Sequence, residues 1–418
     1  MKRPAWVGNL YCTTQKQDTD PMQAIRFLHS ALAQALPTVH SRRLKTLMCC
    51  VSALLQGRRL TLTGLGRFMS GKAYPKHAIK RVDRLLGNRH LQTERSLFYW
   101  VMLRALLGSL RHPLILVDWS PIDAAGEFFL LHAAIPLAGR SFPIYESVHE
   151  REGCPKYQKR LLQTLAEMLP KNCVPILVAD AGFRRPWIKA VEAQGWYYVG
   201  RVRNRDLYRN DAHTWLPVKN LYALASSSPK SLGRIEMTQS APHFIHLYCV
   251  RHSAKGRKHQ RVTGSIAKNK LSRQSANRER EPWLLASNLP EDQWNPSRIV
   301  AIYKQRMQIE EGFRDVKSEH FGVGVTRHRS HCPRRIEVLL LISTLANYII
   351  CLTGLQAREA GHEHRFQSNS LKRRRVLSLW RLGLEYWRSG RGSNSRKTLE
   401  RLERALRAEV HQQAQALE

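Results

Sequence analysis

Apolar residues recur every three or four positions through residues 22–110, which is the spacing of one face of an α-helix. Ile25, Leu28, Leu32 and Leu36 show this spacing most plainly. The pattern predicts a helical first domain over residues 22–110.

A short helix with a basic outer face is predicted within this domain, at residues 77–86. Its apolar positions face inward, which leaves Lys80, Arg81 and Arg84 outside and available to DNA. The preceding stretch, residues 61–67, resembles the turn region of a small helical DNA-binding module. A helical packing domain with a solvated basic face is an equally good interpretation.

The pattern changes at residue 113, where short continuous apolar runs replace the helical spacing. Such runs are typical of strands covered on both faces of a sheet. Three hairpin-linked runs are followed by helix, strand, helix and strand, so we predict an α/β fold with a mixed sheet. The predicted strands are 113–118, 128–134, 141–146, 175–180 and 196–202, and the predicted helices are 156–169 and 184–194.

A polar and basic segment at residues 204–281 interrupts this fold. It contains a strand-like run at 244–250, and residues 251–273 hold eight Lys or Arg and no acid. We interpret 204–281 as a β-rich basic insertion whose basic loop is disordered when free.

The core of the fold resumes after the insertion, so two segments form it, 111–203 and 282–330. An apolar run restarts at Pro282, and one helix is expected over 299–319. The remaining residues, 331–418, are predicted to form a helical C-terminal region.

One apolar segment in that region, residues 338–355, reaches the length of a membrane-spanning helix. It has no charged side chain, but Ser343, Thr344 and Asn347 interrupt it. A single marginal segment in a highly charged chain is weak support for a span. We therefore predict a buried core helix and no membrane.

The net charge of the chain indicates which class of molecule it binds. Among 418 residues, 68 basic and 32 acidic side chains give a formal net charge of +36. Nucleic acid is the first candidate for the polyanion that such a surplus requires. An anionic membrane surface is the second, and it would require basic amphipathic helices or a lipidation motif. The eight cysteines lack C-x-x-C spacing, so we expect free thiols in a reducing cytoplasm.

Three acids occupy positions that suit chemistry. Asp118 and Asp180 end apolar strands, and Glu310 lies on the helix after the insertion. Ligands bind over the carboxyl ends of strands in open α/β sheets, and three carboxylates suit Mg²⁺ or Mn²⁺. Two such ions about 4 Å apart activate a water or a 3′-hydroxyl for phosphodiester transfer. A lone aspartate more often ends a turn or caps a helix, but the combination favours metal binding.

Glu310 also belongs to a Y-x2-R-x3-E-x6-K pattern with Tyr303, Arg306 and Lys317. On one continuous helix, at about 100° per residue, these four residues form a single stripe, and Glu311 points about 80° to the other side. The stripe suits a metal-binding carboxylate flanked by phosphate contacts. A solvated helix face with an Arg306–Glu310 ion pair is the alternative.

Five short stretches carry a family resemblance. They are Lys80–Arg89, Val117–Ser120, Ala179–Phe183, Gly195–Tyr197 and Arg306–Glu311. They resemble bacterial insertion-sequence transposases of the DDE class, in the subgroup that carries the Y-x2-R-x3-E-x6-K signature. Transposon-ten and transposon-five enzymes typify this subgroup, and the chain is more similar to the transposon-ten type.

The resemblance implies a ribonuclease-H-like catalytic core interrupted by a β-strand insertion. It implies Asp118, Asp180 and Glu310 as the metal-binding triad for two Mg²⁺ ions, for which Mn²⁺ can substitute. The implied activity is cut-and-paste transposition, in which nicking, a hairpin on the transposon end and its opening precede strand transfer. The implied partners are double-stranded transposon ends and target DNA, bound by a homodimer at the bacterial nucleoid.

The resemblance also implies contacts to DNA around a base flipped out of the helix. Tyr303, Arg306 and Lys317 would hold the end DNA, and Trp283 would stack on the base and offset the energy of flipping. A packed strand residue is the alternative for Trp283.

The chain departs from the relatives in two places. Residues 1–21 precede the point where the relatives begin, so Met22 is a candidate start and 1–21 a candidate non-native extension. Asp180 follows a plain apolar run, 176–179, where the transposon-five type has an acidic stretch containing Arg.

Two other classes of protein remain open at this point. A ribonuclease-H-like nuclease would share the three acids without needing the Tyr-Arg-Lys stripe. A domesticated DNA-binding protein would be expected to have lost one of the acids, and all three are present.

Overall fold

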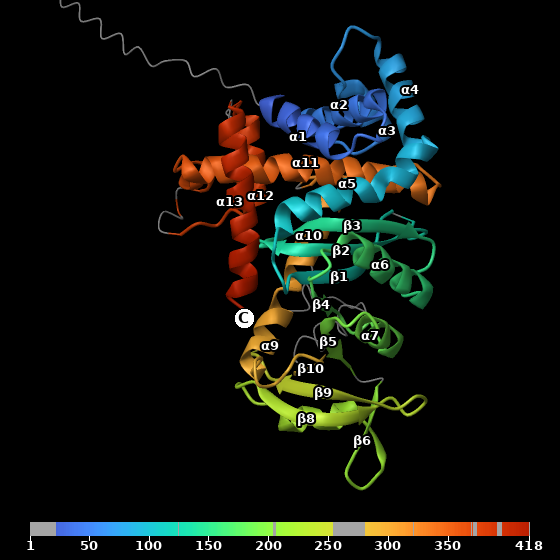
Figure 1. Cartoon of the computed structure of the whole chain (residues 1–418), viewed down its shortest axis with the longest axis vertical. Coiled ribbons are helices and arrows are strands. Elements are labelled where there is room, and N and C mark those ends of the chain that lie inside the picture. Colours follow the sequence, from blue (N-terminus) through green and yellow to red (C-terminus); the bar gives the residue numbers. More distant parts are fainter. Residues whose placement is uncertain are drawn as a thin grey trace, which may run out of the picture.

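The computed structural model describes residues 22–123, 125–203, 206–253, 281–320, 322–368, 370, 374–390 and 395–417. Five helices occupy the predicted helical region at one end of the molecule (Figure 1). They are α1 (Met22–Ala35), α2 (Ser41–Gly57), α3 (Leu62–Phe68), α4 (Pro75–Leu86) and α5 (Arg89–Leu107). Most of the basic loop predicted within 251–273 lies outside the described residues, as does the candidate extension 1–21.

The predicted mixed sheet is present, with three antiparallel strands leading into two parallel ones. Strand β1 pairs antiparallel with β2, which pairs with β3, while β1, β4 and β5 run parallel. Helices α6 and α7 make the connections between β3, β4 and β5. The bounds are β1 (Leu114–Pro121), β2 (Phe129–Leu137), β3 (Arg140–His149), α6 (Pro155–Met168), β4 (Ile176–Ala179), α7 (Arg185–Glu192) and β5 (Tyr197–Val202).

The predicted β-rich insertion extends this sheet rather than forming a separate one. Strand β10 pairs antiparallel with both β5 and β9, which gives a sheet of ten strands in the order β3-β2-β1-β4-β5-β10-β9-β8-β6-β7. The sheet therefore runs from the helices to the far end of the molecule (Figure 1). The elements of the insertion are β6 (Leu207–Arg209), β7 (Trp215–Pro217), η1 (Val218–Leu224), β8 (Lys230–Met237) and β9 (His243–Val250). Strand β10 (Trp283–Ser287) begins the second core segment.

The single helix expected over 299–319 is two helices, α9 (Pro296–Lys304) and α10 (Met307–Lys317). At the junction, Gln305 and Arg306 donate backbone hydrogen bonds three residues back, to Ile302 and Tyr303, as in a 3₁₀ turn. The tighter turn changes the rotation about the helix axis between side chains before it and side chains after it. The assumption of one uninterrupted α-helix from Tyr303 to Lys317, on which the predicted stripe rests, is therefore wrong.

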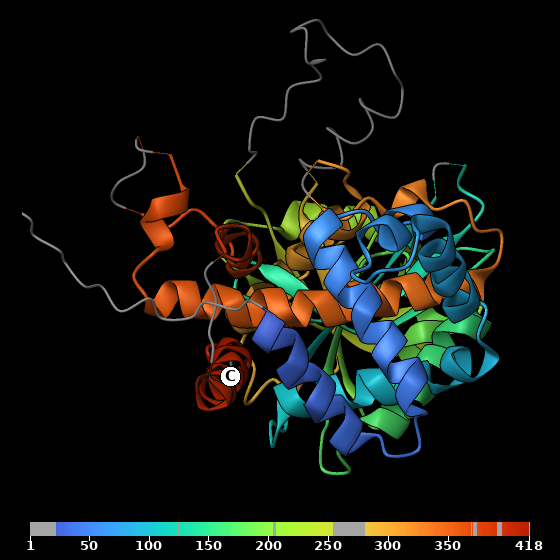
Figure 2. The same ribbon diagram turned by 90° about the horizontal axis from the view of Figure 1, so that it is seen from above.

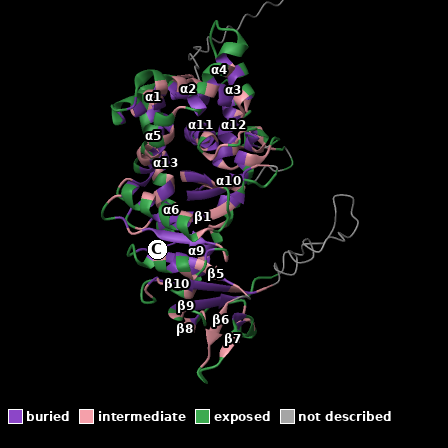
Figure 3. Ribbon diagram, turned by 90° about the vertical axis from the view of Figure 1, so that its right-hand side faces the viewer, coloured by how far each residue is buried: buried purple, intermediate pink, exposed green. Residues whose placement is uncertain are grey.

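The long apolar segment forms the middle of α11 (Pro333–Glu359), which crosses beneath α2 (Figure 2). It is the one helix among the described residues that is long and apolar enough to span a membrane, and 94% of its most apolar window is buried inside the protein. The remaining elements are η2 (Val325–Arg327), η3 (Glu363–Phe366), α12 (Leu379–Arg388) and α13 (Arg396–Gln415). Buried side chains of the helices, the sheet and α11 form one continuous hydrophobic cluster (Figure 3).

A buried polar network fixes the sheet against the helices. The Glu146 carboxylate on β3 accepts hydrogen bonds of 2.8 Å from the hydroxyls of Tyr99 on α5 and Thr344 on α11. It also pairs with His132 Nδ1 at 3.1 Å. Although burial raises the pKa of Glu146, these hydrogen bonds and the charge of His132 outweigh it and lower the pKa. His132 is the cross-strand partner of Asp118, so the network holds the strand that carries this acid.

Candidate active site

Asp118 and Asp180 lie side by side at the same edge of the sheet. Val117 on β1 is the register partner of Ala179 on β4, so the next residue of each parallel strand is an aspartate. The Asp118 carboxylate accepts the N–H of Trp119 at 2.9 Å, and the Asp180 carboxylate accepts the N–H of Gly182 at 2.7 Å. Backbone N–H groups one or two residues later thus fix both carboxylates.

Arg306 joins the third acid to the first. Its Nη1 lies 3.0 Å from Asp118 Oδ2 and its Nη2 lies 2.5 Å from Glu310 Oε1. Glu310 is in the first turn of α10, and its side chain is 48% exposed, whereas that of Asp118 is 14% exposed. The guanidinium therefore links a half-exposed carboxylate to a mostly buried one.

The electrostatics reflect the crowding of these acids. Burial raises the pKa of Asp118 from 3.8 to about 7, and the charges of Asp180 and Glu310 add to the rise. Arg306 opposes it, and the Asp118 and Glu310 carboxylates in turn help to raise the pKa of Arg306 against its burial. Proximity of like charges is a common property of functional sites.

The donor set fits a divalent metal ion in its chemistry. Carboxylate oxygens are the ligands that Mg²⁺ and Mn²⁺ prefer, and a cation would offset both the burial of the Asp118 charge and its repulsion by Asp180 and Glu310. No group of three His, Cys, Asp or Glu side chains in the described part of the chain is close enough together to hold a metal ion. Arg306 instead supplies the positive charge between Asp118 and Glu310.

A comparison with known families decides what kind of protein carries this site. Residues 109–349 match the family model described as a transposase DDE domain, and the match covers more than half of the chain. The chain belongs to the DDE transposase family. The matched segment includes Asp118, Asp180 and Glu310. No curated protein matches the chain.

Membership has direct consequences for the class of reaction. DDE transposases are nucleases and strand transferases that act on DNA, and they normally use divalent metal ions. The mixed α/β fold of this transposase, with its ten-stranded mixed sheet, is consistent with a ribonuclease-H-like architecture.

Lys317 of the transposase, at the end of α10, contacts the strand that carries Asp118. Its Nζ donates hydrogen bonds to Ser120 Oγ at 2.6 Å and to the Pro121 carbonyl at 3.1 Å, and it lies 5.4 Å from the Phe313 ring centroid. Burial lowers the pKa of Lys317, against the charge of Asp118. The structure thus brings the basic end of the signature next to β1.

Tyr303 and Trp283 form an aromatic cluster beside the acids. Their ring centroids are 5.0 Å apart with the rings edge to face, and His252 lies 4.4 Å from Trp283. Tyr303 is only 4% exposed, whereas Trp283 is partly exposed at the start of β10. Trp283 is therefore not a fully buried strand residue.

Two arginines near this cluster were missed in the sequence. Arg201, the second-last residue of β5, lies 5.9 Å from the Trp283 ring centroid, and Arg203 follows two residues later. Arg201 Nε and Nη2 and Arg203 Nε are buried without a hydrogen-bond partner in the described residues. Burial and the charge of Arg203 lower the pKa of Arg201. The signal was available, because β5 is the parallel neighbour of β4 and ends at the same edge as Asp180.

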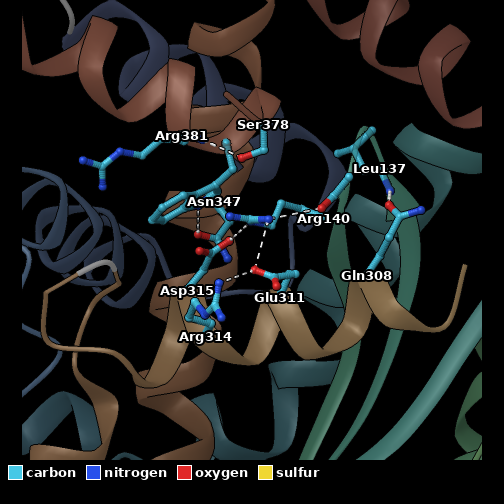
Figure 4. Close-up of polar contacts among 11 residues, drawn as sticks. Leu137, Arg140, Gln308, Glu311, Arg314, Asp315, Asn347, Ser378 and Arg381 are labelled. Carbon is cyan, nitrogen blue, oxygen red and sulfur yellow. Dashed lines mark hydrogen bonds and ion pairs between the residues drawn. The ribbon is translucent and has the colours of Figure 1, made fainter. Parts of the chain in front are cut away.

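The opposite side of α10 makes a separate ionic network (Figure 4). Arg140, the first residue of β3, reaches Asp315 at 2.8 Å and Glu311 at 3.3 Å. Arg314 also pairs with Glu311, at 3.0 Å. Glu311 is thereby engaged away from Arg306.

The basic residues predicted on the short helix lie elsewhere. Lys80, Arg81 and Arg84 are exposed on α4, among the helices beyond β3 (Figure 1). Arg81 donates to Thr46 Oγ1 at 3.1 Å. No hydrogen bond or ion pair of the described residues connects them to the three acids.

Proposed function

We propose that this transposase moves an insertion sequence by cutting and joining DNA at terminal inverted repeats. Asp118, Asp180 and Glu310 are the proposed catalytic and metal-binding residues. The observation that carries this proposal is their arrangement within a segment matched by the DDE model. Asp118, within β1, lies beside Asp180, which directly follows the neighbouring parallel strand β4, and the glutamate is joined to Asp118 through Arg306.

The three carboxylates would hold two Mg²⁺ ions, for which Mn²⁺ can substitute. When bound, such ions supply activation of the attacking oxygen and stabilisation of the leaving oxygen. Arg306 keeps Asp118 and Glu310 paired in this structure. We propose that Arg306 turns from the carboxylates toward a DNA phosphate when DNA and metal enter, since a guanidinium pairs equally well with phosphate.

The DNA would be held by the residues around the acids. Lys317 is positioned beside β1 to contact a phosphate. Trp283, supported by Tyr303, offers a partly exposed ring on which a flipped base could stack. The helical region 22–110 would bind the transposon end through Lys80, Arg81 and Arg84, which are exposed on α4.

The proposed reaction follows the transposon-ten subgroup that the signature resembles. Water attacks a phosphodiester at the transposon end and frees a 3′-hydroxyl. This hydroxyl attacks the phosphodiester of the opposite strand, which closes a hairpin and releases the flanking DNA, and a second water opens the hairpin. The regenerated 3′-hydroxyl then attacks a target phosphodiester. A homodimer would hold two ends together for this last step.

The deciding experiment is Mg²⁺-dependent strand transfer of DNA that carries the sequences flanking the gene. We expect Glu310→Ala to lower the rate at least about a hundredfold, because it removes a group that acts on the reacting phosphate. Removing divalent ions with a chelator should abolish joining by the wild type. Glu311→Ala is the matched control, since Glu311 pairs with Arg140 and Arg314 instead.

Two outcomes would contradict the proposal. Full activity of Glu310→Ala would exclude the triad assignment. Cleavage by the wild type with neither joining nor hairpin would indicate a nuclease of the same fold.

A further inference from the structure

A groove of about 580 Å³ runs beside β3, the strand at one edge of the sheet. Helix α5, helix α6 and the beginning of α11 form its other walls. Its lining is mostly polar, with hydroxyl groups on three of the four elements. Thr93, Ser96, Ser147 and Thr164 supply these hydroxyls.

The groove carries more positive than negative charge. Arg160 and Arg334 are exposed in its walls, and neither forms an ion pair within the described part of the chain. Arg95 is only 5% exposed, and its Nε has no hydrogen-bond partner among the described residues. One lining acid, Glu337, is neutralised by Arg95 at 2.8 Å, which leaves Glu167 as the other.

The groove and the candidate active site lie at the same end of the strands of the sheet. Strands β1 and β3 both run antiparallel to β2, so they end on the same side. Trp119, which follows Asp118 on β1 and points to the opposite face of the sheet, lies edge to face with His149 at the end of β3, at 5.7 Å. His149 stacks on Tyr157 of α6 at 3.8 Å, and both line the groove. A row of three rings thus leads from β1 into the groove.

The positive field in the groove also acts on this histidine. Burial, followed by the charges of Arg160 and Arg95, lowers the pKa of His149 to about 4. His149 is therefore neutral at pH 7, and a bound anion would be favoured by Arg160, which forms no ion pair within the described part of the chain. Cations combined with hydroxyl donors are the usual contacts of proteins to a nucleic-acid backbone.

We propose that this groove binds the phosphate backbone of a DNA segment that passes the candidate active site. The inference rests on the proposed function, because it takes DNA as the substrate. Arg160 and Arg334 would contact phosphates, and the hydroxyls would hold sugar and phosphate oxygens. The segment is either the transposon end or the target, and the two sources differ only in sequence.

Photocrosslinking tests the position of the DNA. Thr164→p-benzoylphenylalanine places a reactive group in the groove, and Gln163→p-benzoylphenylalanine, one residue earlier on α6 and not part of the lining, is the matched control. Two labelled duplexes are used, one with the sequences flanking the gene and one of unrelated sequence. We expect the Thr164 variant to crosslink to DNA severalfold more than the Gln163 variant. The duplex that crosslinks identifies end or target, and equal crosslinking by the two variants would overturn the proposal.

Salt titration tests the charges. In Arg160→Ala/Arg334→Ala, the slope of log affinity against log salt should become shallower by about 0.9 for each phosphate that the variant no longer neutralises. Lys171→Ala/Arg404→Ala removes two exposed cations outside the groove and serves as the control. Equal slopes for the two double variants would also overturn the proposal.

The two proposals can fail separately. If the wild type does not join DNA but Thr164→p-benzoylphenylalanine still crosslinks to it, the proposed function fails and the groove assignment stands. If the wild type joins DNA and Arg160→Ala/Arg334→Ala binds and joins it equally well, the groove assignment fails and the proposed function stands.

Discussion

At the scale of single residues, the side chains of α10 divide between two environments. Glu310 and Lys317 turn toward β1, where they meet Arg306 and Ser120. Asp315 turns the other way, toward Arg140 at 2.8 Å (Figure 4). One short helix thus serves the candidate active site on one side and the packing of the β2–β3 turn on the other.

Asp315 gives the first prediction at this scale. Burial raises its pKa from 3.8 to about 7, more than the pairing with Arg140 lowers it. Between about pH 4 and pH 7 the folded protein therefore binds a proton that the unfolded chain has released, so this group makes the free energy of unfolding fall as pH rises. Asp315→Asn removes this dependence. Relative to wild type, the variant should gain stability with rising pH, by up to about 1.4 kcal/mol per pH unit.

Urea unfolding at intervals across this pH range provides the measurement. Asp292→Asn is the control, because Asp292 is an exposed acid. A variant-to-wild-type difference that is the same at every pH would show that Asp315 does not titrate in the way its burial implies.

At the scale of elements, one turn and one close contact between helices determine how the elements are arranged. The 3₁₀ turn at Gln305 and Arg306 redirects the chain between α9 and α10. Helices α11 and α12 touch through glycines, since a Cβ on Gly383 would lie 1.9 Å from the Ile350 carbonyl oxygen and one on Gly354 would lie 2.3 Å from that of Leu379. These distances leave no room for a side chain.

The contact between α11 and α12 gives the second prediction. In Gly383→Ala the added methyl must push α12 away from α11, which should lower the free energy of unfolding by about 1–3 kcal/mol. The better helix propensity of alanine offsets at most about 1 kcal/mol of this. Chemical denaturation measures the change.

Gly87→Ala is the matched control for this substitution. Its new methyl would meet only the end of the flexible Arg335 side chain, at 3.1 Å. Equal stability of the two variants would show that the helices can separate at no cost in stability.

At the scale of the whole molecule, a net charge of +36 accompanies one elongated sheet, with α1–α5 and α11 at one end and α6, α7 and α9 beside its strands (Figure 1). The positive charge is not confined to the candidate active site, since exposed cations lie on α4, on α6 and at the start of α11. DNA should therefore contact the protein over several elements at once.

The third prediction concerns that extended contact. If six to ten phosphates are contacted, affinity for duplex DNA should fall by roughly 10³–10⁵ between about 50 and about 200 mM salt. Fluorescence anisotropy with a labelled duplex of unrelated sequence provides the measurement. A nearly flat salt dependence would show that the charge serves another purpose than DNA binding.

The sequence by itself determined the helical region, the succession of the core strands along the chain, the buried character of α11 and the position of Asp180 at the end of a strand. Asp118, predicted to end its strand, lies within β1, which continues to Pro121. These features follow from local periodicity, which is set by which neighbouring side chains must be buried. The matched family was also foreseen from short motifs, which are local as well. The three acids remain a proposed catalytic set.

Only the tertiary structure decided how these parts meet. Arg306 lies 188 residues from Asp118 in the chain, and no local pattern specifies that the two pair. The merging of the insertion into the sheet through β10, the place of Arg201 beside Trp283 and the groove beside β3 depend likewise on long-range packing. The predicted stripe assumed straight α-helix where backbone bonds three residues back tighten the turn, yet Arg306 still reaches Glu310 and Asp118, and Lys317 reaches Ser120 on the same strand. The periodicity of apolar residues predicts whether a segment is a helix or a strand, whereas contacts between distant segments decide which residues it packs against.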